Sequence, residues 1–82
     1  MRNIQYIDIE QARLVLAELG IALTARQMKR AADKGLDGSR KLPFFLDPID
    51  GRLKIEKTTL VSIYMRRQID AEKAWKNTGI YL

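Results

Sequence analysis

Near the start of the chain, apolar side chains recur at the three- and four-residue spacing of an amphipathic helix. The members of this stripe are Ile9, Ala12, Val15, Leu16 and Leu19. Asp8 precedes the stripe and Gln11 follows Asp8 by three residues, which is the spacing of a capping box. Gly20 comes directly after the stripe, where glycine commonly ends a helix. The pattern predicts a first helix over about residues 9–19.

The same N-terminal signature returns at Thr24, which Gln27 follows by three residues. It predicts a second helix over about residues 25–34, ended by Gly35. The residues expected on its inner face are Met28, Ala31 and Ala32. Residues 20–23 connect the two helices, and a link of four residues that starts with glycine is typical of a helix-turn-helix.

Two short strands joined by a turn are predicted in the middle of the chain. Residues 42–46 are mostly apolar, and residues 47–51 are rich in turn-forming Asp, Pro and Gly. Residues 52–55 alternate cation and aliphatic side chain, which is the pattern of a half-buried strand. Leu53 and Ile55 are therefore expected to face the core.

The register of this hairpin is open between two alternatives. A two-residue turn at Asp50-Gly51 would pair Leu46 with Ile55. A five-residue loop at 47–51 would instead place Phe45 opposite Leu53. Because a chain with so few aromatic residues needs them inside, at least one of Phe44 and Phe45 is expected in the core.

The helical period returns at about Lys57. The buried stripe of this third helix is expected at Leu60, Val61, Ile63 and Tyr64. The helix is predicted to run to about Trp75, and residues 80–82 form an apolar tail that either folds back or contacts a partner. The expected organisation is an N-terminal arm at 1–7, a folded domain at 8–76 and a C-terminal tail at 77–82.

Composition narrows the chemistry that the chain can perform. Its 82 residues include neither Cys nor His, which removes disulfides, thiolate metal sites and the commonest general base. The carboxylates show no paired motif, so we expect no enzymatic activity, no metal site and no cofactor. No apolar run approaches the ~20 residues of a membrane span, and the N-terminus does not resemble a signal peptide. These features predict a small cytoplasmic domain without a membrane partner.

The net charge is +5, and the excess is concentrated in two segments. Residues 24–41 contain six cations and two acids, and residues 52–67 contain five cations and one acid. Two basic segments that flank a predicted turn fit a DNA-binding surface, and they also fit the solvated basic surface of many small proteins.

The order helix, turn, helix, loop, hairpin, helix resembles the excisionase and MerR-type winged-helix family. The segments that carry the resemblance are Leu42-Pro43-Phe44-Phe45, the Asp50-Gly51 turn, Arg52-Leu53-Lys54-Ile55 and the helix around Leu60. It covers about residues 6–67 and implies a mainly α fold with a β-hairpin wing, a winged helix-turn-helix. The short chain favours the small stand-alone excisionase-like branch. The turn at 20–23 and the loop at 35–41 are longer than in many members.

Two groups of residues are expected to contact DNA. The proposed readers on the second helix are Arg26, Gln27, Lys29 and Arg30, since Arg can bind guanine and Gln adenine in a bidentate way. The proposed backbone clamp around the wing is Arg40, Lys41, Arg52 and Lys54. Thr24, as an N-cap, would place the positive end of the helix near a phosphate. Arg66 and Arg67 are weaker candidates for backbone contact.

The sequence thus predicts a sequence-specific double-stranded DNA-binding protein, an excisionase-like architectural factor in site-specific recombination that is associated with the nucleoid. The expected partners are a DNA duplex, further copies of the chain on adjacent sites and a recombinase. Two alternatives stay open. One is a small transcriptional regulator of a plasmid, phage or other mobile element, and the other is a protein-interaction module that does not bind DNA.

Overall fold

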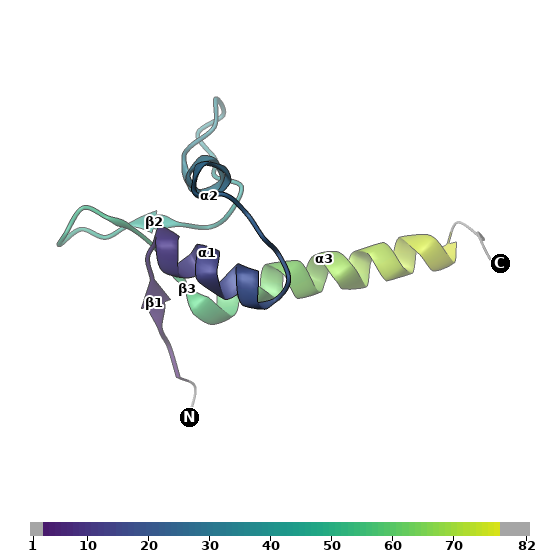
Figure 1. Cartoon of the computed structure of the whole chain (residues 1–82). Helices are drawn as coiled ribbons and strands as arrows, with labels where there is room; N and C mark the ends of the chain where they lie inside the picture. Colours follow the sequence, from purple (N-terminus) through teal and green to yellow (C-terminus); the bar gives the residue numbers. More distant parts are fainter. Residues whose placement is uncertain (1–2, 78–82) are drawn as a thin grey trace.

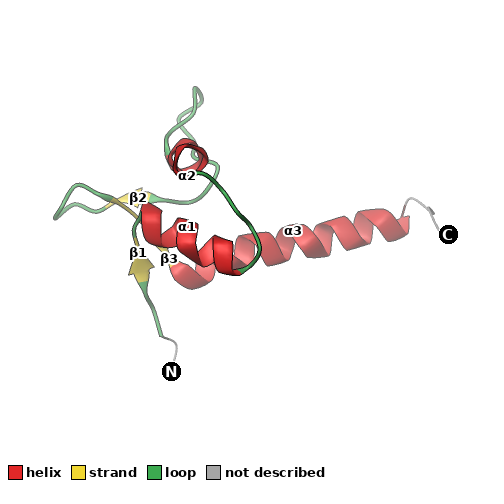
Figure 2. Cartoon of the chain, in the orientation of Figure 1, coloured by secondary structure: helices red, strands yellow, loops and turns green. Residues whose placement is uncertain are grey.

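The computed structural model describes residues 3–77, which form three helices and a three-stranded antiparallel sheet (Figure 1, Figure 2). The helices are α1 (Ile9–Glu18), α2 (Ala25–Ala32) and α3 (Lys57–Asn77). The strands are β1 (Tyr6–Ile7), β2 (Phe45–Leu46) and β3 (Leu53–Glu56). The fold is a small mixed α/β arrangement in which the predicted helices and hairpin are joined by an additional N-terminal strand.

The two predicted helix starts are confirmed. The Asp8 carboxylate accepts a hydrogen bond from the Gln11 N–H at 2.8 Å, and the Asp8 N–H donates to Gln11 Oε1 at 3.0 Å. Thr24 caps α2 in the same reciprocal way. Gly20 follows the end of α1 with φ of 90°, a conformation that suits glycine. α2 ends earlier than predicted because Asp33 leaves the helical conformation, with ψ of 151°.

The strand order is β1-β3-β2, so β3 is the central strand. Tyr6 of β1 lies opposite Glu56, and Ile7 lies opposite Ile55. Residues 1–7 are predicted to form an arm, whereas Ile7 is 3% exposed and belongs to the core. A strand of two residues is too short to show a period, so only its pairing with a distant segment reveals it.

Neither of the two predicted hairpin registers is correct. The pairs that form are Phe45 opposite Lys54 and Leu46 opposite Leu53. The β2–β3 loop therefore spans residues 47–52, and it is closed by a hydrogen bond of 2.8 Å from the Asp47 N–H to the Arg52 carbonyl. Gly51 within this loop has φ of 70°. The turn is longer than a two-residue hairpin turn, which shifts every cross-strand pair.

β2 is shorter than the predicted strand because the chain bends at Pro43. The Phe44 N–H donates to the Leu42 carbonyl at 2.7 Å, which closes a tight turn around the proline. Phe44 is 4% exposed and Phe45 is 43% exposed. The expectation that at least one of these two rings lies in the core is therefore confirmed. The exposed ring of Phe45 packs edge-on against Tyr6, with centroids 5.6 Å apart.

An apolar cluster joins α1, α2, β3 and the first turns of α3. Its fully buried large side chains are Leu16, Met28, Ile55 and Leu60. Each of these comes from a different element, so the cluster fixes the position of α2 relative to the sheet. The predicted inward faces of α2 and β3 are confirmed, since Met28 and Ile55 are both buried.

The second half of α3 lies outside this cluster. Every residue from Met65 to Trp75 is exposed, and Figure 1 shows this part of the helix projecting away from the body. The radius of gyration is 15.2 Å, whereas a compact chain of this length has about 12 Å. α3 extends slightly past the predicted end to Asn77, and the predicted tail at 80–82 lies outside the described residues. Within residues 3–77, no helix is both long enough and apolar enough to cross a bilayer.

Candidate nucleic-acid interface

The outer face of α2 carries cations, and its inner face is apolar. Met28 is fully buried, whereas Arg26, Lys29 and Arg30 are exposed. Arg26 and Arg30 are one turn apart and therefore lie on the same face of the helix. No carboxylate among residues 3–77 lies within ion-pair distance of these three cations. Their charges are available to an external anion.

The N-terminus of α2 is held by a capping box that uses two of the predicted contact residues. Thr24 Oγ1 accepts from the Gln27 N–H at 3.1 Å, and the Thr24 N–H donates to Gln27 Oε1 at 2.8 Å. The structural role of Thr24 as an N-cap is confirmed. Gln27 is exposed, but its amide oxygen is engaged at the cap, which restrains the side chain. We therefore base the interface on the three cations of α2 rather than on Gln27.

Lys54 on β3 is held by two aspartates of the β2–β3 loop. Its Nζ lies 3.0 Å from Asp50 Oδ2 and 3.0 Å from Asp47 Oδ2, and 21% of its side chain is exposed. The hydrogen bonds to Asp50 and Asp47 raise the pKa of the Lys54 ammonium above its ordinary value. The charge of Lys54 is thus compensated within the molecule, which argues against a free phosphate clamp. Arg52, by contrast, is exposed and has no ion-pair partner among the described residues.

The same two aspartates fix the backbone of the β2–β3 loop. Asp47 Oδ1 accepts from the Ile49 N–H at 2.8 Å, and Asp50 Oδ1 accepts from the Arg52 N–H at 2.9 Å. These backbone hydrogen bonds, followed by those from Lys54, lower the pKa of both carboxyls. From the sequence, Asp47 and Asp50 are predicted only as turn formers, and their second role, the compensation of Lys54, is not predicted. Their short spacing to Lys54 along the chain was the available signal.

Arg40 and Lys41 belong to the segment between α2 and β2. Residues 34–40 form a small hairpin, here called the α2–β2 hairpin, in which Lys34 and Arg40 are paired as an antiparallel bridge. Lys41 is exposed, and Arg40 is half-buried. The buried Nε of Arg40 has no hydrogen-bond partner among the described residues. Both cations therefore belong to the segment that directly follows α2 in the chain.

Figure 1 shows how the predicted contact residues are distributed. α2 and the α2–β2 hairpin lie on one side of α1, and the β2–β3 loop projects separately from the sheet. All three lie away from the projecting end of α3. The predicted contact residues therefore belong to two separate projections, one made of α2 with the segment that follows it and the other made of the β2–β3 loop, which carries Arg52. Arg66 and Arg67 are exposed on the projecting half of α3, outside this group.

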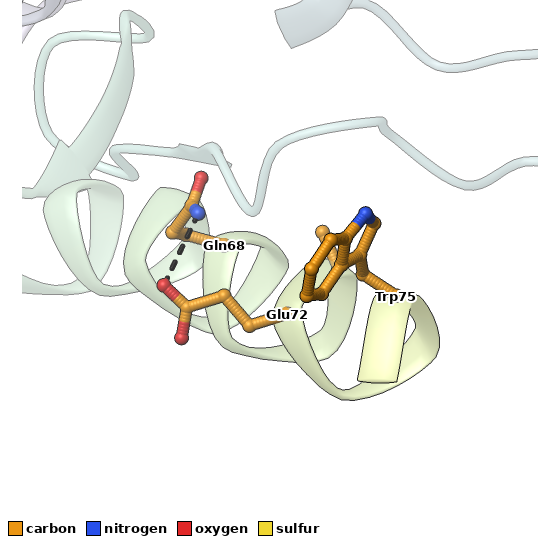
Figure 3. A pocket seen from close by; sticks show the side chains of 4 residues that line it. Gln68, Glu72 and Trp75 are labelled. Atoms are coloured by element: carbon orange, nitrogen blue, oxygen red, sulfur yellow. Dashed lines mark hydrogen bonds between the residues drawn. The ribbon is translucent and has the colours of Figure 1, made fainter. Parts of the chain in front are cut away.

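A surface hollow of about 460 Å³ lies on the projecting half of α3 (Figure 3). It is lined by Gln68, Ala71, Glu72 and Trp75, all from that one helix. Gln68 Nε2 donates to Glu72 Oε1 at 3.3 Å across its edge. The hollow lies on α3, whereas the candidate interface lies on α2 and the segment after it. The hollow is therefore not part of the candidate interface.

Comparisons of the chain with protein-family models, with curated proteins and with solved structures found no match. The interface is therefore defined by geometry and charge alone. Its main part is the outer face of α2 with the cations that follow it, and Arg52 is an outlying member.

Proposed function

We propose that this chain binds double-stranded DNA as an excisionase-like winged-helix protein, with α2 in the major groove. The observation that carries the proposal is the uncompensated cationic face of α2, opposite an inner face on which Met28 and Ala32 are buried. The helix has eight residues and is about 12 Å long, and the major groove is about 12 Å wide. An α-helix of this size fits the groove with its cationic side toward the base edges.

The side chains of α2 have different roles in this arrangement. Arg26 and Arg30, which share a face, are the readers, because a guanidinium binds guanine O6 and N7 in a bidentate way. Lys29 and the N-terminus of α2 at Thr24 lie against phosphates. A change at a reader should relax the sequence preference, whereas a change at a phosphate contact should weaken binding to all duplexes alike.

The cations around α2 supply the contacts to the DNA backbone. Arg40, Lys41 and Arg52 join Lys29 in this set, and Lys54 is left out because Asp47 and Asp50 compensate it. The four cations Lys29, Arg40, Lys41 and Arg52 correspond to a slope of log affinity against log salt of roughly −3.6. A slope near zero would exclude a DNA-binding role.

The test begins with selection of bound duplexes from a randomised pool, followed by fluorescence anisotropy on a recovered sequence. Arg26→Ala and Arg30→Ala should each weaken binding to that sequence by about 1–3 kcal/mol, and much less on an unselected duplex. Lys73→Ala is the matched control, because it removes one exposed cation from the projecting half of α3. Equal effects of Arg30→Ala and Lys73→Ala would show that α2 has no special role.

The biological process can be either recombination or transcription, since both use the same contacts. As an architectural factor in recombination, the protein would bind as several copies on tandem sites and bend the DNA without chemistry of its own. As a regulator of a mobile element, it would bind a site that overlaps a promoter. Footprinting on DNA from the neighbourhood of its own gene separates the two, because tandem sites beside an integrase gene support the first.

A protein-interaction role is the second candidate, and one observation favours it. The projecting half of α3 exposes the apolar side chains of Met65, Ile69 and Trp75. Such a surface suits contact with another protein. Absence of duplex binding at low salt, together with a flat salt dependence, would make this the leading function.

A further inference from the structure

The α2–β2 hairpin is ordered by its own hydrogen bonds. The Gly35 N–H donates to the Ser39 carbonyl at 2.7 Å, and the Gly38 N–H donates to the Gly35 carbonyl at 3.0 Å. Asp37 Oδ1 accepts from both the N–H and the hydroxyl of Ser39, at 3.0 Å and 2.8 Å. The segment between α2 and β2 is therefore a defined projection rather than a loose connection.

The tip of this projection is apolar. Leu36 has a relative exposure of 112%, so its side chain touches almost nothing else in the molecule. A single exposed leucine is ordinary on a protein surface. Leu36 differs because it belongs to an ordered hairpin in which the cations Lys34 and Arg40 are paired at the base, and the cation Lys41 follows directly.

The hairpin is also fixed to α2. The Leu42 N–H, just beyond the hairpin, donates to the carbonyl of Ala31 on α2 at 3.2 Å. At the other end, the Asp33 N–H donates to the Lys29 carbonyl at 2.9 Å and ends the helix. The hairpin must therefore follow α2 to any surface that α2 contacts.

We propose that the α2–β2 hairpin occupies the minor groove beside the major-groove site of α2, with Leu36 as an apolar wedge between base steps. This inference rests on the proposed function. Proteins that insert aliphatic side chains into the minor groove partly unstack a base step and bend the duplex toward the major groove. Lys34, Arg40 and Lys41 at the base of the hairpin face the phosphates on either side of the groove. Residues 33–41 contain three cations and two acids, Asp33 and Asp37, and their net positive charge favours a narrow groove of high negative potential.

The β2–β3 loop supplies an internal comparison. Its Ile49 is 91% exposed, so it is also an aliphatic side chain at the tip of an ordered projection. Asp47 and Asp50 in that loop offset Arg52 and Lys54, which leaves the loop without excess positive charge. The α2–β2 hairpin also contains an acid, Asp37, but residues 33–41 keep an excess of one cation, whereas residues 47–54 have none. Ile49 is therefore the matched control for Leu36.

The test uses a selected duplex of about 30 bp with a donor and an acceptor fluorophore at its two ends. Wild-type protein should bring the ends closer and protect one minor-groove segment from hydroxyl radicals. Leu36→Ala should lower affinity about tenfold, since each carbon withdrawn from water contributes roughly a factor of four and burial is partial. It should also abolish the bend and the minor-groove protection. Ile49→Ala should leave all three readouts within about twofold, because a surface substitution away from the contact has little effect.

Three outcomes are distinguishable. If Leu36→Ala loses the bend while Ile49→Ala keeps it, the wedge is supported. If Leu36→Ala matches wild type in affinity, bend and footprint while Arg30→Ala weakens binding, the wedge is refuted and the proposed function stands. If wild-type protein binds no duplex at low salt, the proposed function fails and the wedge fails with it. Both side chains are outside the core, so circular dichroism should show unchanged folding for either variant.

Discussion

The compensation of Lys54 leads to a prediction about the salt dependence of DNA binding. Lys54 and Arg52 lie two residues apart on the same projection, but only Arg52 is free of described carboxylates. Each cation that neutralises a phosphate adds about −0.9 to the slope of log affinity against log salt. Arg52→Ala should therefore flatten the slope by about 0.9, whereas Lys54→Met should leave it nearly unchanged.

The change in salt dependence caused by the loss of one phosphate contact is large enough to measure. Between about 50 mM and about 200 mM salt, one contact changes the salt-dependent loss of affinity by a factor of about 3.5. Fluorescence anisotropy of a labelled duplex over this range resolves such a factor. Circular dichroism of each variant checks that the protein is folded before binding is compared.

The double variant Asp47→Asn with Asp50→Asn should change the slope of log affinity against log salt in the opposite direction to Arg52→Ala. The asparagine oxygens can still accept the hydrogen bonds from the Ile49 and Arg52 N–H groups, which hold the loop. The charges that compensate Lys54 are removed, so the slope should become steeper by up to about 0.9. The reasoning is refuted if Lys54→Met flattens the slope as much as Arg52→Ala does, or if the double variant does not change it.

Two further predictions concern residues 44–50, which include β2 and most of the β2–β3 loop. Phe44→Ala should lower the free energy of unfolding in urea by about 3–5 kcal/mol because the ring is 4% exposed. Phe45→Ala should cost about 1 kcal/mol, because the ring is 43% exposed and mainly loses its pairing on the sheet. The lowered pKa values of Asp47 and Asp50 mean that the folded loop binds fewer protons than the unfolded chain. Their stabilisation should persist above about pH 4 and disappear as the pH falls through the lowered folded values. Acid titration of the loop amides by NMR checks this, and a midpoint above the ordinary Asp value would contradict it.

The helix starts could be predicted because their signals are local. Asp8 with Gln11, and Thr24 with Gln27, need only a spacing of three residues, and both capping boxes form as expected. The positive φ of Gly20 also follows from its position after α1. Such features are encoded within one turn of the chain and do not depend on how the elements pack.

The strands were harder because their pairing joins distant segments. β1 has only two residues, and its partner residues on β3 are about fifty positions away in the sequence. The hairpin register depends on the length of the β2–β3 loop, which the side chains of Asp47 and Asp50 stabilise through hydrogen bonds. The pattern of apolar residues is satisfied by more than one register, so it could not select the correct one.

Charge counting gave two basic segments of equal excess, and the structure makes them unequal. On α2 and the α2–β2 hairpin, the outer cations have no described carboxylate partner. In the β2–β3 loop, the two aspartates that hold the turn also accept hydrogen bonds from Lys54. The charge of Lys54 is therefore compensated within the loop. Such a loop adds little electrostatic attraction to DNA phosphates, because its acids balance its cations. If the protein binds DNA as proposed, most of the affinity and its salt dependence should therefore come from α2 and the hairpin after it, with Arg52 as the main cation of the β2–β3 loop.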